Sequence, residues 1–264
     1  MSRNLKITLA YDGSEFYGWQ VQPGLATVQG TLAECLKRLT GEDVLPQGSG
    51  RTDAGVHALG QVASVRLESP IPERNLIVAL NDMLPASVRV MNVEAAADDF
   101  HARHAAKAKT YRYRIYRGDI CPPFLARYVY HDPYPMNEEA VMRSSEAVVG
   151  KHDFTSFAAS DPDRSARMAQ AAEEEDEAFH FGKLNNVRTI HSSQWARTED
   201  ELIYTVRGDG FLHHMVRNLV GTFLLVGKGS LKIGDVPTIL EARNRSAAGP
   251  TAAACGLYLV SVEY

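Results

Sequence analysis

The sequence predicts a mixed α and β protein in which a β-sheet packs against helices. Along most of the chain, segments that alternate polar and apolar residues take turns with segments of helical apolar spacing. Apolar residues make up 45% of the 264 residues and charged residues 23%, which is the composition of a globular protein. The length allows a large core and leaves one domain and two domains both open.

The first hundred residues alternate between predicted strands and helices. Residues 4–11 have the period of a half-buried strand, which the turn Asp12-Gly13 ends. Apolar residues over 28–39 follow helical spacing, with Thr27 placed to cap the helix and Gly41 to end it. The pattern then predicts a strand around 61–67, a helix that starts at Pro72 and a strand over 88–93.

The rest of the chain follows the same plan less regularly. Residues 109–117 predict a strand whose tyrosines face one side and whose arginines face the other. Further patterns predict a helix over about 137–149, strands over about 187–196 and 202–207, a helix over 211–226 and a strand over 257–262.

Several protein classes are excluded. Apolar residues do not follow the charges at the N-terminus, so no secretory signal is expected. The most apolar window, 211–226, contains polar and charged residues and is not a membrane span. Three cysteines, odd in number and far apart, argue against a disulfide framework and for a reducing cytoplasm.

Charge is unevenly distributed although the net charge is only −4. Acids outnumber bases from Asp161 to Lys183, which predicts a solvated insertion. A competing interpretation is that this insertion competes with RNA for a basic groove. From His101 to Arg117 the chain has bases and no acid, which suits contact with a polyanion.

The densest motif, 48–58, places one carboxylate, Asp53, among three glycines, with Arg51 before it and His57 after it. The glycines leave room for another molecule to approach the backbone. Three interpretations stay open on the residues alone: a structural turn, a phosphate-binding loop and a catalytic carboxylate. The phosphate loop is the weakest, because the Gly-Lys-Ser/Thr ending of the Walker pattern is missing.

Two further segments suggest chemistry. Over 107–117, bases alternate with tyrosines, which suits contacts to phosphates and stacking on bases, or equally an ordinary strand with buried tyrosines. Within 211–218, Arg217 interrupts an apolar helix, so it needs an anionic partner or must extend to solvent. The paired histidines of the chain lack metal-site spacing, and no metal is predicted.

With these segments in hand, nearly the whole chain resembles the TruA-type tRNA pseudouridine synthases. Several long motifs in the same order make this resemblance more specific than any single match. The stretches that carry it are Tyr11-Asp12-Gly13, Phe16–Gln20, Gly50–Ala58, Phe100–Arg103, Thr110–Tyr113, His152–Phe157, Phe211–Asn218, Ala248–Thr251 and Gly256–Leu259.

The resemblance implies the α+β pseudouridine synthase fold, in which two ferredoxin-like halves share a mixed, mainly antiparallel sheet flanked by helices. Residues 1–105 would carry the catalytic aspartate loop. Residues 106–264 would carry the base-stacking Tyr and the ion-pairing Arg, with the acidic insertion at about 160–183. The resemblance also implies a cytoplasmic homodimer that binds tRNA across both subunits, with no organic cofactor, no catalytic metal and no membrane.

The implied activity is the isomerisation of uridine to pseudouridine at positions 38, 39 and 40 of the tRNA anticodon stem-loop. Asp53 matches the family's aspartate nucleophile, which acts on a flipped-out nucleotide. Attack on C1′, addition to the base and removal of the 2′ proton stay open, and the resemblance favours the last, a glycal route. Arg51 would fill the vacated space and Tyr111 would stack on the uracil. Arg217 would pair with Asp53, and Leu257 would wall the base pocket.

Two other classes of function are compatible with parts of the sequence, and several basic residues are candidates for contacts to RNA phosphates. A catalytically silent RNA-binding protein has no need for a carboxylate that faces RNA phosphates. A metal-dependent hydrolase that uses Asp53 and His57 would bind metal and be inhibited by chelators. The candidate phosphate contacts are Arg103, Lys107, Lys109, Arg112 and Arg114.

Overall fold

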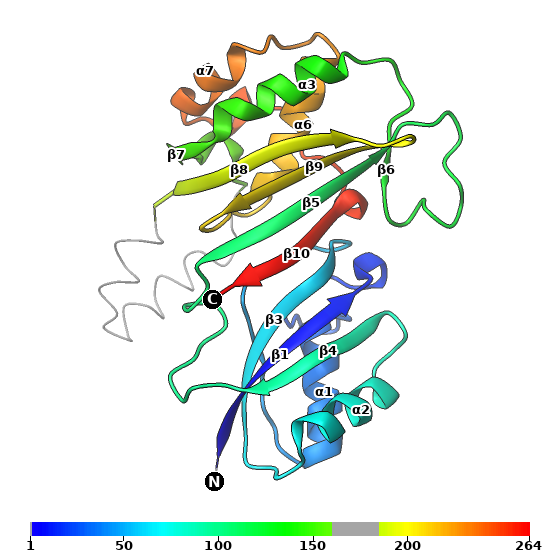
Figure 1. Ribbon diagram of the computed structural model, residues 1–264, viewed down its shortest axis with the longest axis vertical. Helices are drawn as coiled ribbons and strands as arrows, with labels where there is room; N and C mark the ends of the chain where they lie inside the picture. Colours follow the sequence, from blue (N-terminus) through cyan, green and yellow to red (C-terminus); the bar gives the residue numbers. More distant parts are fainter. Residues whose placement is uncertain (1, 160–184) are drawn as a thin grey trace. The chain divides into compact units, whose positions relative to one another are not determined.

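The computed structural model describes residues 2–159 and 185–264, so the acidic insertion expected at about 160–183 lies outside the described residues (Figure 1). Two compact units make up the chain. The first contains Met1–Pro133, Arg197–Ile203 and Ala253–Tyr264, and the second contains Tyr134–Ala196 and Tyr204–Ala252. The predicted halves 1–105 and 106–264 are defined by their similarity to each other. A division into compact units does not test that similarity, so the two halves stay a prediction.

The first unit is built on a mixed β-sheet. Its strands are β1 (Arg3–Tyr11), β2 (Gln47–Gly48), β3 (His57–Leu67), β4 (Val88–Ala95), β5 (Ala108–Tyr116), β6 (Tyr130–His131), β10 (Leu257–Glu263) and the start of β9 (Glu201–Gly208). The order is β4-β1-β3-β10-β5, followed by β9, with β2 on β3 and β6 on β5. β1 is antiparallel to both neighbours, whereas β10 is antiparallel to β5 and parallel to β3.

The strands of this unit form where the sequence alternates. In β5, Tyr111, Tyr113 and Ile115 are buried, while Arg112 and Arg114 on the opposite face are half-buried. This arrangement confirms the predicted division of the strand into a tyrosine face and an arginine face. Burial of the tyrosine face supplies the hydrophobic stabilisation that holds β5 in the sheet.

Two helices flank the sheet of the first unit. α1 (Val28–Thr40) starts and ends at the predicted caps: the Thr27 side chain accepts from the Gly30 N–H, and Gly41 has the left-handed φ of 79°. α2 (Glu73–Met83) follows Pro72, packs along β4 and contacts α1 (Figure 1).

The second unit combines helices with strands. It contains α3 (Glu138–Ser144), β7 (Gly150–Asp153), all of β8 (Val187–Arg197) except its last residue, the end of β9, α6 (Met215–Gly227) and α7 (Asp235–Ala242). β7 pairs antiparallel with β8, and α6 is buried along most of its length and packs on α3 (Figure 1). None of the helices in the described ranges is long and apolar enough to cross a membrane.

Short 3-10 helices join these elements. They are η1 (Gly13–Glu15), η2 (Ser145–Val148), η3 (Thr155–Phe157), η4 (Arg245–Ala247) and η5 (Ala254–Gly256). One of them corrects an expectation, because the helix predicted over about 137–149 ends at Ser144 and continues only as η2.

The helix predicted over 211–226 is also shorter than expected. It begins at Met215, because His214 has a φ of 58°, a left-handed conformation that an α-helix cannot include. The sequence pattern missed β7 and α7 altogether. β7 is too short to show a clear alternation, and α7 has only eight residues.

Candidate active site

Asp53 lies on a loop between β2 and β3 in the first unit, over residues 49–56, which we call the aspartate loop. The residue is half-buried, and its neighbours Arg51 and Ala54 are exposed. The carboxylate is therefore not sealed in the core, and a second molecule can approach the loop that carries it.

β3 supports the aspartate loop from one side through Gln61, which is fully buried. The Gln61 Oε1 accepts from the Ser49 hydroxyl at 2.7 Å, and its Nε2 donates to the Gly50 carbonyl at 2.9 Å. The Ser49 N–H donates to the Val62 carbonyl at 2.7 Å. These bonds fix the start of the loop, because each one joins a loop atom to the rigid sheet.

The segment after β1 supports the same loop from another side. The Trp19 N–H donates to the Thr52 carbonyl at 3.0 Å, and the Gly55 N–H donates to the Phe16 carbonyl at 3.2 Å. Gly18 has a φ of 86°, and a Cβ there would lie 2.4 Å from the Thr52 carbonyl oxygen. The Tyr11 hydroxyl lies 2.8 Å from the Thr52 Oγ1. The residues on both sides of Asp53 are thus held in place.

His57, at the end of the aspartate loop, is part of the fold rather than of a metal site. Its Nδ1 accepts from the Gly13 N–H at 3.1 Å, and its Nε2 lies 3.1 Å from the Arg127 carbonyl. Its ring stacks on that of Tyr258 with centroids 4.8 Å apart. Burial lowers the pKa of His57, although the Asp12 carboxylate 3.3 Å away opposes this shift. Both ring nitrogens contact backbone groups, so neither is available to a metal ion.

Tyr111 on β5 is a predicted site residue whose pKa is influenced by the charge of Asp53. Burial raises the pKa of the Tyr111 hydroxyl, and the charges of Tyr11 and Asp53 raise it further. Asp53 and Tyr111 therefore share one electrostatic environment, in which the phenol stays protonated at neutral pH. Leu259 pairs with Tyr111 across the strands, and the buried Leu257 lies two residues before it on the same face.

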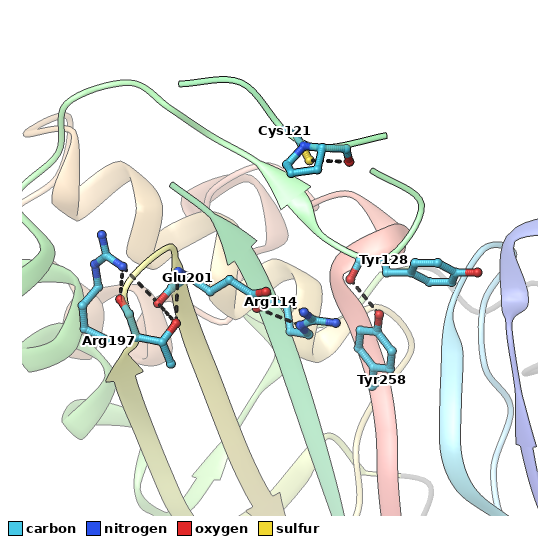
Figure 2. Close-up of polar contacts among 8 residues, drawn as sticks. Arg114, Cys121, Tyr128, Arg197, Glu201 and Tyr258 are labelled. Atoms are coloured by element: carbon cyan, nitrogen blue, oxygen red, sulfur yellow. Dashed lines mark hydrogen bonds and ion pairs between the residues drawn. The ribbon is translucent and has the colours of Figure 1, made fainter. Parts of the chain in front are cut away.

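Arg114, on the arginine face of β5, is engaged within the protein. Its Nε and Nη2 donate to the two carboxylate oxygens of Glu201 at 2.8 and 2.5 Å, the two-point geometry typical of Arg–carboxylate pairs (Figure 2). Its guanidinium also lies 5.8 Å from the ring centre of Tyr258. These contacts weaken the expectation that Arg114 binds a phosphate.

Two other candidate phosphate contacts lie near the aspartate loop. The Lys109 Nζ donates to the Ser49 carbonyl at 2.5 Å, so this cation holds the loop. Burial lowers the pKa of the Arg103 guanidinium, and the positive charge of Arg51 lowers it further. Two neighbouring cations of which one is desolvated favour an anion between them.

Arg217 lies in the second unit, in the first turn of α6, and is half-buried. Its Nε donates to the Ala252 carbonyl at 2.7 Å, and its own carbonyl accepts from the Ala252 N–H at 3.1 Å. The guanidinium is therefore anchored by backbone on one edge. The remaining predicted site residues, Asp53, Arg51, Tyr111 and Leu257, all belong to the first unit.

Comparison with known proteins decides the family. The sequence model of the family described as tRNA pseudouridine synthase matches residues 7–104 and 145–264, which include both the aspartate loop and the first turn of α6. The chain belongs to this family. It is thus an isomerase, because a pseudouridine synthase rearranges a nucleoside without adding or removing atoms.

The chain matches proteins named tRNA pseudouridine synthase A over nearly its full length and theirs. The chain is 50% identical to a tRNA pseudouridine synthase A of Solibacter usitatus over 262 residues, which are 99% of this chain and 100% of the relative. It is 44% identical to that of Moorella thermoacetica over 98% of this chain and 99% of the relative. It is 39% identical to that of Caldicellulosiruptor saccharolyticus over 99% and 100%.

Proposed function

We propose that this chain converts uridine to pseudouridine at positions 38, 39 and 40 of the tRNA anticodon stem-loop, with Asp53 as the catalytic carboxylate. The observation that carries the proposal is the placement of Asp53. It is half-buried on a loop fixed at several points, it acts electrostatically on Tyr111, and the chain belongs to the tRNA pseudouridine synthase family. Fixed geometry of this kind favours catalysis, because a reacting group must be held close to its target.

The chemistry requires a carboxylate at the sugar of the target uridine. The bond between ribose C1′ and uracil N1 breaks, the base turns, and a bond forms between C1′ and C5. In the route that we favour, Asp53 takes the proton from C2′ as uracil leaves as an anion, which gives a C1′=C2′ double bond, and returns that proton to C2′ as C5 bonds to C1′. The proton on C5 then moves to N1, so that atoms and electrons balance and nothing is oxidised or reduced.

The target uridine must leave its stack before Asp53 can reach the ribose. Arg51 is exposed two residues before Asp53, which suits the proposed role of filling the vacated space. Tyr111 is proposed to stack on the uracil. Its raised pKa supports stacking over a role as base in the resting enzyme, because very little phenolate is present at neutral pH. Tyr111 and Leu257 are both buried, so stacking predicts a local opening when tRNA binds.

Two further roles complete the proposal. Arg217 is proposed to pair with Asp53, because an adjacent guanidinium favours the ionised carboxylate and holds it in place. Arg103 is proposed to bind a tRNA phosphate, on the strength of its desolvated guanidinium beside Arg51. We also propose a homodimer that binds tRNA across both subunits and acts in the cytoplasm, where tRNA is found. These last points rest on the family resemblance.

Replacement of Asp53 tests the proposal. We expect Asp53→Asn and Asp53→Ala to keep the Kd for tRNA within about twofold and to lose at least about 1,000-fold in single-turnover rate. Mapping of pseudouridines in tRNA exposed to each protein identifies the modified positions. Asp43→Asn is the matched control, because Asp43 is exposed and contacts only Lys37, at 2.7 Å, among the described ion pairs.

Two results would contradict the proposal. Undiminished pseudouridine formation by Asp53→Asn would remove Asp53 from the reaction. A wild-type protein that binds tRNA and forms no pseudouridine would instead favour the silent RNA-binding interpretation.

A further inference from the structure

Asn218 is a fully buried polar residue that directly follows Arg217 in α6. Both polar atoms of its amide make short hydrogen bonds. Oδ1 accepts from the Thr251 hydroxyl at 2.7 Å and from the Arg245 Nη2 at 3.0 Å, and Nδ2 donates to the Phe157 carbonyl at 2.7 Å. One side chain thus joins α6 to two segments that are distant in sequence, and a partner lost here would leave a buried polar group unpaired.

A second set of contacts fixes α6 against the segment 249–251. The Thr222 hydroxyl donates to the Asn218 carbonyl at 2.8 Å and accepts from the Gly249 N–H at 2.9 Å. A Cβ on Gly221 would lie 1.8 Å from the Pro250 carbonyl oxygen, so the helix and the segment touch through their backbones. The position of 249–251 is therefore set by the first two turns of α6.

The residue that anchors Arg217 comes directly after this segment. The Ala252 carbonyl accepts from the Arg217 Nε at 2.7 Å, one residue beyond Thr251. Because the Nε–H bond lies in the guanidinium plane, the Ala252 carbonyl fixes one direction within that plane. A shift of Thr251 would move this carbonyl and turn the guanidinium.

We propose that Asn218 is a positioning residue for Arg217, acting through Thr251 and the Ala252 carbonyl. The inference rests on the proposed role of Arg217 in holding Asp53. It also gives a function to two stretches that carry the family resemblance and that the reaction itself does not use. These are His152–Phe157, which ends at Phe157, and Ala248–Thr251. Asn218 touches no reacting atom in this account. It sets the direction in which the Arg217 guanidinium points.

A double-mutant cycle tests this inference. We expect Asn218→Ala to lower the single-turnover rate about tenfold and to leave KM within about twofold, because misorientation affects the chemical step. In an Arg217→Ala background, the same substitution should change the rate less than about twofold, because there is no guanidinium left to orient. Rates are measured at a temperature where every variant is folded. Asn244→Ala is the matched control, since Asn244 caps η4 through the Ser246 N–H.

A milder pair of variants keeps the inference testable if Asn218→Ala does not fold. Thr251→Val removes the hydroxyl that contacts Asn218 and keeps the side-chain shape, and we expect a loss of about threefold in rate. Thr251→Ser keeps the hydroxyl and should restore the wild-type rate.

Three outcomes overturn the inference, and they have different meanings. Equal losses from Asn218→Ala in both backgrounds, or a wild-type rate in Asn218→Ala and Thr251→Val, would show that Asn218 does not act through Arg217. A wild-type rate in Arg217→Ala would instead locate the failure in the proposed role of Arg217. In that case Asp53→Asn would still lose the reaction, so the proposed function would stand.

Discussion

Substitution of Gln61 by Met tests whether the aspartate loop depends on the sheet beneath it. Met keeps the length and the unbranched shape of Gln but has neither its carbonyl nor its amide. The change removes the hydrogen bonds at 2.7 Å to the Ser49 hydroxyl, at 2.9 Å to the Gly50 carbonyl and at 3.1 Å from the Val62 N–H. Because Gln61 and Ser49 are both fully buried, water does not replace these partners at the Ser49 end.

The expected loss follows from the number of groups left unpaired. A buried polar group without a partner costs about 1–3 kcal/mol, so three such groups give about 3–9 kcal/mol. The Ser49 hydroxyl can rotate toward another acceptor and Gly50 is half-buried, which places the expected loss in free energy of unfolding at the lower end of this range, about 3–5 kcal/mol. A loosened loop should also lower the single-turnover rate about tenfold, because Asp53 is then held less accurately.

Urea unfolding measures the first effect and pseudouridine formation at substrate saturation measures the second. Gln47→Met is the matched control. Gln47 is exposed, and its side chain bonds only the Leu45 carbonyl among the described residues, so the free energy of unfolding should stay within about 0.5 kcal/mol of the wild type. If Gln61→Met also stays within that range, the support that we assign to Gln61 is refuted. If stability falls but the rate does not, the loop does not need the sheet for catalysis.

Two further predictions concern single side chains of the first unit. We expect Tyr111→Phe to keep tRNA affinity within about twofold and Tyr111→Ala to weaken it about tenfold, because the ring supplies the stacking face; equal Kd values for the two variants, measured at fixed salt, would count against stacking. Burial lowers the pKa of His57 below its ordinary 6.5, so the folded state favours the neutral ring. The contribution of His57 to the free energy of unfolding should therefore be complete above pH 6.5 and be lost as the pH falls below 6.5, where the unfolded chain takes up the proton first. His57→Gln should flatten that part of the curve of unfolding free energy against pH, and an unchanged slope would show that His57 does not contribute.

The elements of the first unit could be predicted because their signals are local. Thr27 and Gly41 cap α1 as the sequence indicates, since capping needs only the residue and its near neighbours. Alternation in β5 likewise fixes which face is buried, as Tyr113 and Arg114 show. The family could be recognised for a related reason: its motifs are continuous stretches of sequence.

The start of α6 could not be predicted, because the local signal points the other way. The stretch from Phe211 onward keeps helical apolar spacing, yet the helix begins only at Met215. The left-handed backbone of His214 decides the boundary, and that conformation is unfavourable for a non-glycine residue. Surrounding contacts must maintain it, among them the bond from the Ala159 N–H to the His213 carbonyl at 3.0 Å. Such contacts are long-range and leave no pattern in the window that predicts a helix.

The support of the site was missed for a similar reason, and it changes how the motifs are understood. Considered alone, the Tyr11-Asp12-Gly13 and Phe16–Gln20 stretches suggest no chemistry, and Gln61 is one polar residue in an apolar strand. In the structure, both stretches and Gln61 contact the aspartate loop through Thr52, Gly55 and Gly50. In the second unit, Asn218 contacts Thr251, the neighbour of the residue whose carbonyl accepts from Arg217, and the proposed support of Arg217 follows from these contacts. A buried polar residue in an apolar element must find a partner, so it is the sequence signal for such support. The partner itself emerges only from the fold.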